Sequence, residues 1–278
     1  MPTAFLAFAL VLFGLATLPA RAAESYDSCS GFIDALPATI TRSGTWCLRH
    51  DLGTAIASGA AIEVAANNVT IDCNDFKLGG LAAGNGSKAH GISLSGRLNL
   101  TVRNCSIRGF GIGVFARGEG GGHVIEDNRF DGNLSTAITT DHAVVRRNLV
   151  SGTGGYIVGV STAAISAYGT SDVLDNIISG VRVESSVGKA TGIRVYSSFG
   201  GTVSGNRVSG VAGAGSQVVV AIEVATGGRV AVRDNILQSD IAGSTGILCD
   251  STQVRVRGTM ATGFATATSG CGDAGPGD

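Results

Sequence analysis

The chain has 278 residues, and its 20 basic and 21 acidic side chains give a formal net charge of −1 at pH 7. No basic stripe is present that would neutralise a phosphate backbone, so nucleic acid is not an expected partner. Glycine accounts for 43 residues without the one-in-three spacing of collagen, and this indicates many short strands joined by tight turns.

The first segment of the chain has the pattern of an export signal. An apolar run extends from Phe5 to Leu18, Pro19 follows it, and Ala20-Arg21-Ala22 is a small-x-small triplet of the kind that signal peptidase cleaves. The run is too short for a membrane-spanning helix, and no later segment is long and apolar enough for one. We therefore expect residues 1–22 to be a signal peptide and the mature chain to be secreted or periplasmic, without a transmembrane segment.

The next segment, residues 23–60, precedes the repeats and is expected to cap their N-terminal end. The sequence has six cysteines, and an even number in an exported chain is typical of disulfide bonds. Cys29 and Cys47 flank this segment, and Cys249 and Cys271 flank the C-terminal one. Each couple is a candidate disulfide that would fasten one end of the fold.

From residue 61 to residue 263 the sequence repeats two short patterns. One is a small residue, Ile, any residue and an apolar or small residue, and its copies recur about every 26 residues. The Ile positions are Ile62, Ile92, Ile112, Ile138, Ile165, Ile193, Ile222 and Ile247. The second pattern, apolar-x-x-Asn-x-apolar-x-Gly, falls between these copies. Its asparagines are Asn128, Asn148, Asn176, Asn206 and Asn235.

These patterns predict an all-β solenoid. Each unit holds three short segments of alternating apolar residues, and none has a stripe long enough for a crossover helix. Parallel strands wound into about eight coils would bury the apolar side chains, and each coil would stack on the next. The recurrent Asn would sit at a bend, where its amide joins a hydrogen-bonded ladder and its backbone tolerates a left-handed conformation. Residues 264–278 would form a loose tail.

Two further cysteines lie inside the repeats. Cys105 stands where other copies have the recurrent Asn, and Cys73 lies one unit earlier. They would either bridge neighbouring units or remain buried thiols, and the sequence leaves both possibilities open.

The strings NVTIDCN (68–74) and NLTVRNCSIRGFGIGV (99–114), followed by repeated x-Asn-x-Ile/Val-x-Gly, carry a family resemblance. The chain resembles the right-handed parallel β-helix repeat proteins of the pectin-lyase-like superfamily, in particular uncharacterised bacterial secreted proteins similar to the NosD type. The resemblance covers roughly residues 29–263 and implies a right-handed parallel β-helix. It implies no particular activity, because many chemistries occur on this scaffold.

Catalytic strings that the resemblance would bring are absent. Polygalacturonases of the superfamily carry Asn-Thr-Asp, adjacent Asp residues, Gly-His-Gly and Arg-Ile-Lys, and alginate-epimerase-like enzymes carry Asp-Pro-His-Asp. None of these strings occurs here, which favours a non-catalytic protein, and no cofactor is expected. The four histidines, His50, His90, His123 and His142, lack metal-ligand spacing, so no metal site is expected either.

One outward row of the repeats carries side chains suited to a sugar ligand. The position three after the repeat Ile holds Phe115, Asp141, Tyr168 and Tyr196, which would fall on four successive coils at one edge of a sheet. Aromatic faces beside an acid could stack on a sugar ring, or the aromatic rings could pack only on one another. If the row is catalytic, His142 could act as base with Asp141 orienting it, or Tyr168 could donate a proton.

Other charged residues lie near this row. Glu119 and His123 belong to or border the Gly-rich segment at residues 116–123. The position one after the repeat Ile points outward, and it gives one opposite-charge neighbour pair, Arg194 with Glu223. We expect this pair to be a surface ion pair, worth about 0–1 kcal/mol.

Three functions of different classes fit these observations. The first is a secreted, non-catalytic protein that binds a polysaccharide or another cell-envelope component along its coil face. The second is a polysaccharide lyase, hydrolase or epimerase with a non-standard site near Asp141, His142 and Tyr168. The third is a periplasmic accessory factor, as the similarity to the NosD type implies.

Overall fold

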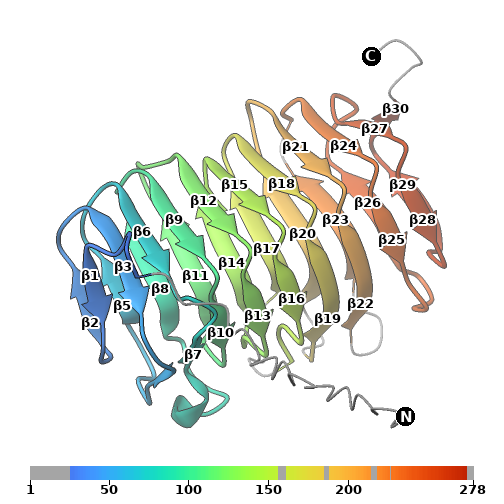
Figure 1. Ribbon diagram of the computed structural model, residues 1–278. Coiled ribbons are helices and arrows are strands. Elements are labelled where there is room, and N and C mark those ends of the chain that lie inside the picture. The colour runs from blue at the N-terminus through green and yellow to red at the C-terminus, as the bar shows by residue number, and fades with distance from the viewer. Residues whose placement is uncertain (1–25, 156–160, 185–187, 214–217, 226, 274–278) are drawn as a thin grey trace, which may run out of the picture.

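The computed structural model describes residues 26–155, 161–184, 188–213, 218–225 and 227–273. The expected signal peptide, residues 1–22, lies outside these ranges. Within them the chain forms short strands throughout, and the one helical element is a 3-10 turn, η1 (Leu81–Ala83). Figure 1 shows the strands stacked as successive coils along one axis. In the described ranges, no helix has the length and apolar character needed to cross a membrane.

The strands form three parallel sheets, and each full coil contributes one strand to each sheet in turn. Sheet 1 consists of β2 (Ala38–Ile40), β5 (Ala60–Val64), β8 (His90–Ser95), β11 (Ile112–Arg117), β14 (Thr136–Asp141), β17 (Thr162–Tyr168), β20 (Lys189–Tyr196), β23 (Val218–Ala225), β26 (Thr245–Cys249) and β29 (Thr266–Ser269).

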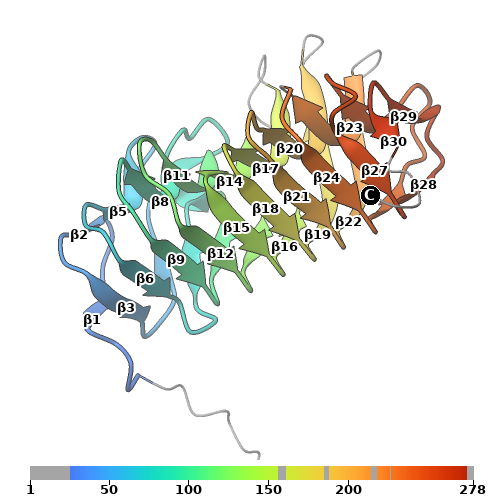
Figure 2. The same ribbon diagram turned by 90° about the horizontal axis from the view of Figure 1, so that it is seen from above.

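Sheet 2 consists of β1 (Gly31–Ile33), β3 (Gly44–Leu48), β6 (Val69–Asp72), β9 (Leu100–Arg103), β12 (His123–Glu126), β15 (Ala143–Arg146), β18 (Ser171–Leu174), β21 (Gly201–Ser204), β24 (Val230–Arg233), β27 (Arg255–Arg257) and β30 (Gly272–Asp273). Sheet 3 consists of β4 (Leu52–Gly53), β7 (Lys77–Gly79), β10 (Ser106–Arg108), β13 (Arg129–Asp131), β16 (Leu149–Ser151), β19 (Ile177–Val183), β22 (Arg207–Gly213), β25 (Ile236–Gln238) and β28 (Met260–Thr262). In Figure 2 the strands of sheet 2 lie side by side across the near face.

The interior of the stack is a set of apolar columns, one member per coil. The column of sheet 1 is Ile62, Ile92, Val114, Ile138, Ile165, Ile193, Ile222 and Ile247. Sheet 2 contributes Ile71, Val102, Ile125, Val145, Val173, Val203 and Val232, and sheet 3 contributes Leu78, Ile107, Phe130, Val150, Ile178, Val208 and Leu237. All are buried, and burial of each such side chain stabilises the fold by about 1.5–3 kcal/mol. The expected all-β parallel solenoid of about eight turns is confirmed.

The hydrogen-bonded solenoid extends past the repeat boundaries at residues 61 and 263. At the N-terminal end, β1 pairs with β3 and β2 pairs with β5, so the segment 23–60 already contributes strands to the sheets. At the C-terminal end, β29 pairs with β26 and β30 pairs with β27. Up to Asp273, the C-terminal segment is therefore ordered in strands and is not the expected loose tail. Pairing with the preceding coil satisfies its backbone groups.

The recurrent asparagines form a buried ladder at the bend between sheets 2 and 3. Asn128, Asn148 and Asn176 each donate from Nδ2 to the Oδ1 of the next ladder Asn at 3.0 Å. Asn206 donates in the same way to Asn235, also at 3.0 Å. The backbone N–H of each of these four residues donates to the same oxygen. Each amide thereby links two coils without leaving a buried polar group unpaired.

The left-handed residue at this bend is not the ladder Asn but the residue before it. Asp127, Arg147, Asp175 and Asp234 have φ between 54° and 56°, and Gly205 has φ 69°. The ladder Asn itself keeps an ordinary backbone, so its amide can point inward. The bend thus uses a left-handed residue, but it is the neighbour of the ladder Asn and not the Asn whose tolerance for this conformation the sequence offers.

Disulfides join the chain at both ends and inside the repeats. Cys29 bonds to Cys47 and Cys249 bonds to Cys271, the two couples that flank the terminal segments. Cys73 bonds to Cys105, which bridges neighbouring coils. Since Cys105 occupies a ladder position, this disulfide takes over there the cross-coil link that the amides make elsewhere.

Candidate functional site

The outward column at the C-terminal edge of sheet 1 differs in one member from the expected row. Val114 lies opposite Ile92 and Ile138, and Phe115 therefore pairs with Ser93 and Thr139. The neighbour of Asp141 on β11 is Arg117, because Ala116 pairs with Thr140. Continuing across the coils, Asp141 pairs with Tyr168, and Tyr168 pairs with Tyr196. We call Arg117, Asp141, Tyr168 and Tyr196 the edge column.

The local packing explains this shift of Phe115. Ile112 is flanked by Gly111 and Gly113, so the sequence offers two registers for the repeat. A Cβ at Gly113 would lie 2.8 Å from the buried ring of Phe130, so this position requires glycine and faces the core. Val114 then fills the interior column, and Phe115 leaves the edge column. Its ring stacks instead on His90 of the preceding coil, with centroids 4.8 Å apart.

Arg117, Tyr168 and Tyr196 form a continuous stack. The guanidinium of Arg117 lies 3.6 Å from the ring centroid of Tyr168. The rings of Tyr168 and Tyr196 are 4.8 Å apart at an interplanar angle of 17°. Both faces of Tyr168 are therefore covered by protein. A sugar ring can stack only beyond Tyr196, where the next residue of the column is Ala225 and the guanidinium carbon of Arg194 lies 6.0 Å from the ring centroid.

Two groups of the preceding coil face the carboxylate of Asp141. Its Oδ2 accepts a hydrogen bond from the N–H of Gly118 at 2.9 Å, and its Oδ1 lies 3.8 Å from Nε2 of His123. His142 is not directed at Asp141. It is exposed, has a left-handed backbone with φ 44°, and accepts at Nδ1 from the N–H of Thr170. The expected orientation of His142 by Asp141 is thus not present, because the turn at His142 carries its ring onto the next coil.

His123 is the residue near this site whose position the sequence does not reveal. It is 1% exposed, and its Nδ1 accepts a hydrogen bond from the N–H of Leu100. Burial lowers the pKa of His123, the nearby Asp141 partly offsets this effect, and His142 lowers the pKa further. A neutral imidazole that accepts at Nδ1 carries its proton on Nε2, so that N–H faces the carboxylate of Asp141.

A second polar cluster lies further along the outer face of sheet 1. Arg194 and Glu223 are opposite one another, as the row analysis indicates, but Glu223 is only 6% exposed. It accepts hydrogen bonds from Lys189 and from Nε of Arg194, the latter at 2.7 Å. Lys189 binds Oε1, whereas Arg194 and the hydroxyl of Thr191, the latter at 3.5 Å, both donate to Oε2. The expected surface ion pair is therefore a buried triad, because the Lys189 side chain closes over Glu223.

The triad predicts a defined pH dependence of stability. Burial alone would raise the pKa of Glu223, but the hydrogen bonds and charges of Lys189 and Arg194 lower it overall. The stabilisation is therefore fully present above the ordinary glutamate pKa of 4.5 and is lost as the pH falls through the lower pKa of the folded state. We expect Glu223→Gln to reduce the free energy of unfolding by about 1–3 kcal/mol at pH 7, measured by urea denaturation.

The matched control for this variant is Glu63→Gln on the first coils. Glu63 occupies the same outward row, and its substitution is expected to change the free energy of unfolding by less than about 0.5 kcal/mol. An equal effect of the two substitutions at pH 7, or a difference that grows below pH 4, would contradict the role given to the triad.

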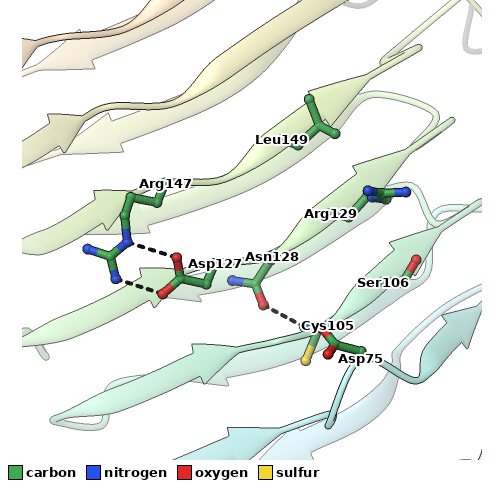
Figure 3. A pocket seen from close by; sticks show the side chains of 8 residues that line it. All are labelled: Asp75, Cys105, Ser106, Asp127, Asn128, Arg129, Arg147 and Leu149. Atoms are coloured by element: carbon green, nitrogen blue, oxygen red, sulfur yellow. Dashed lines mark hydrogen bonds and ion pairs between the residues drawn. The ribbon is translucent and has the colours of Figure 1, made fainter. Parts of the chain in front are cut away.

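A groove with a volume of about 520 Å³ lies at the corner between sheets 2 and 3 (Figure 3). Its charged lining includes Asp75, Asp127, Arg129 and Arg147. Arg147 and Asp127 form a bidentate ion pair, with atoms 2.6 and 2.8 Å apart. The two left-handed corner residues are thus bound to each other, and the ladder beneath them is covered. The groove belongs to the structural corner and does not include the edge column.

In the part of the chain that the structure describes, no three His, Cys, Asp or Glu side chains lie close enough to hold one metal ion. His123 and Asp141 face each other at 3.8 Å, and both are nearly buried.

Comparisons with known proteins agree with this architecture. A family model described as the right handed beta helix region matches residues 52–259. An alginate lyase of Paenibacillus sp. str. FPU-7 superposes with a TM-score of 0.53 at 13% identity, covering 84% of this chain and 99% of the lyase.

Two more distant solved structures also match. The catalytic domain of a GH87 α-1,3-glucanase has a TM-score of 0.43 at 12% identity, with 89% and 61% of the two chains covered. The A-module of the Azotobacter vinelandii mannuronan C-5 epimerase AlgE6 has a TM-score of 0.37 at 14% identity, with 85% of each chain covered. At these identities the likeness concerns the fold. No curated protein matches the chain, and similarity to the NosD type is not among these findings.

Proposed function

The chain belongs to the right-handed β-helix family, and we propose that it is an exported protein that binds polysaccharide along the outer face of sheet 1 without cleaving it. The edge column would supply the contacts: Tyr196 a ring face, Tyr168 a hydroxyl and Arg117 hydrogen bonds to sugar hydroxyls, while the nearly buried Asp141 would offer only the part of Oδ2 that Gly118 leaves open. Phe115 and its partner His90 lie on the same outer face, nearer the N-terminal end, and would extend the contact surface.

The observation that supports this proposal is that contacts within the protein already hold the side chains of the edge column in place. Arg117, Tyr168 and Tyr196 are stacked on one another, and Asp141 is fixed by the N–H of Gly118. Side chains that are already ordered lose little conformational entropy on binding, so this entropy cost takes little from the favourable energy of the contacts. Successive coils present these groups at the strand spacing of about 4.8 Å, which suits an extended polymer lying along the axis.

Export is the second part of the proposal. The predicted signal at residues 1–22 and the three disulfides are both typical of secreted or periplasmic chains. N-terminal sequencing of the protein from the secreted or periplasmic fraction is expected to begin at Ala23. A cytosolic, uncleaved chain would contradict this part.

The binding site is tested by a double substitution. We expect Tyr168→Ala with Tyr196→Ala to weaken binding to the polysaccharide that the wild type retains by at least about tenfold, since a stacking surface and two hydroxyls are removed. Isothermal titration calorimetry measures the affinity, and circular dichroism checks that the coils stay folded. Phe199→Ala is the control, because Phe199 is an 82% exposed aromatic residue close in sequence but outside the column. Equal affinities of the double variant and the wild type would rule out the edge column as the site.

A polysaccharide lyase, hydrolase or epimerase remains the second candidate, and the pairing of Asp141 with His123 beside Tyr168 is the observation that favours it. A carboxylate with a buried imidazole behind it is an arrangement that can serve general acid–base chemistry. Release of unsaturated or reducing sugar that Asp141→Asn abolishes would establish this candidate and displace the first.

A further inference from the structure

The atoms of His123 and Asp141 that face each other are buried and lack other partners. Nε2 of His123 and Oδ1 of Asp141 are 3.8 Å apart, and neither makes a hydrogen bond within the described residues. Both side chains are less than one tenth exposed. Unpaired buried polar atoms are costly, so two that face each other call for a joint explanation.

The remaining polar atoms of the pair determine how it is protonated. Nδ1 of His123 accepts from the N–H of Leu100 at 3.3 Å, and an acceptor nitrogen carries no proton. Burial lowers the pKa of His123, which keeps the ring neutral at pH 7. The ring proton is therefore on Nε2 and is directed at Oδ1 of Asp141. Oδ2 is meanwhile held by the N–H of Gly118 at 2.9 Å.

We propose that His123 is a positioning residue of the edge column: its Nε2–H orients the carboxylate of Asp141 beside the stacked Arg117 and Tyr168 so that this column can bind a polysaccharide. The part of this inference that concerns polysaccharide binding rests on the proposed function. The part that concerns the orientation of Asp141 rests on the geometry alone. Because His123 is buried, it acts on a ligand only through Asp141.

Two substitutions separate the hydrogen bond at Nδ1 of His123 from the contact of its Nε2 with Asp141. His123→Gln supplies an amide donor near the position of Nε2 but no acceptor at Nδ1. His123→Asn supplies an acceptor near Nδ1 for the N–H of Leu100 but no donor toward Asp141. If His123 only supports β9 through the N–H of Leu100, the Asn variant preserves its role. If His123 positions Asp141, the Gln variant preserves its role.

The first measurement needs no ligand. Hydrogen exchange of the Gly118 amide reports whether Asp141 is held in place, and we expect it to be slow in the wild type and His123→Gln and at least about tenfold faster in His123→Asn. Nitrogen chemical shifts of the imidazole are expected to show the proton on Nε2. A proton on Nδ1, or unchanged Gly118 exchange in His123→Asn, would overturn the proposal.

The second measurement is the affinity for the polysaccharide that the wild type retains. We expect His123→Asn to bind at least about tenfold more weakly and His123→Gln to stay within about threefold of the wild type. The reverse order of the two variants would overturn the positioning role. If no polysaccharide binds the wild type, the proposed function fails, while the Gly118 exchange still decides whether His123 holds Asp141.

Discussion

Replacement of Asn176 by Ala is expected to lower the free energy of unfolding by about 2–4 kcal/mol, because the amide lies in the middle of the buried ladder. Its Oδ1 accepts from the backbone and side-chain nitrogens of Asn148, and its Nδ2 donates to Val145 and to Asn206. Alanine leaves the N–H of Asn148 buried without its acceptor and opens a small cavity. Urea denaturation followed by circular dichroism measures the change.

Asn85→Ala is the control for this prediction. Asn85 lies on an exposed loop, and its loss is expected to change stability by less than about 0.5 kcal/mol. If the two variants unfold at the same urea concentration, the ladder does not stabilise the coils in the way described.

Removal of the Cys73–Cys105 disulfide is the second large effect. The bond closes a sequence separation of 32 residues, and its loss in Cys73→Ala with Cys105→Ala is expected to cost about 3–4 kcal/mol through the freedom that the unfolded chain gains. The two cysteines are buried, so the substitution also removes packed atoms from the core. The midpoint of urea denaturation of the oxidised wild type and the double variant gives the difference.

A third variant tests whether position 105 belongs to the ladder. The N–H of Cys105 already donates to Oδ1 of Asn128 at 3.0 Å, as the N–H of each ladder Asn does to the next. In Cys73→Ala with Cys105→Asn the new amide can add one rung, and we expect it to recover about 1 kcal/mol relative to the Ala variant. A further loss of stability instead would show that the ladder does not continue to this coil.

The fold was predictable because its signals are local and repeated. The interior column around Ile138 and Ile165 recurs in every coil, and the ladder asparagines share one spacing within their own repeat. Neither feature depends on knowing which distant residues meet. The ends were less predictable, since β29 and β30 have no apolar repeat and pair through backbone groups that any sequence supplies.

The site was predictable only in part, because side-chain partners depend on register and on turn geometry. Asp141, Tyr168 and Tyr196 share one column as their spacing suggests, but two glycines around Ile112 concealed that Arg117 replaces Phe115 there. No sequence pattern predicted that Asp141 and His123 would face each other. It depends on the turn at residues 118–122, whose glycines have backbone conformations that spacing alone does not specify.

The burial of Glu223 was missed for a similar reason. The repeat spacing predicted that Arg194 is a neighbour of Glu223. It did not predict the contact with Lys189, which lies at the start of β20 and reaches Glu223 on the next coil. Repeat spacing specifies which positions are neighbours, but it does not specify how a long side chain covers a neighbouring residue.

The most direct test of the proposed function is a screen of the mature protein against acidic and neutral polysaccharides in which binding and product release are measured in the same samples. We expect retention of the protein on at least one polymer, with no unsaturated or reducing sugar released during prolonged incubation. Release of product, or the absence of binding to every polymer, would contradict a non-catalytic polysaccharide-binding protein.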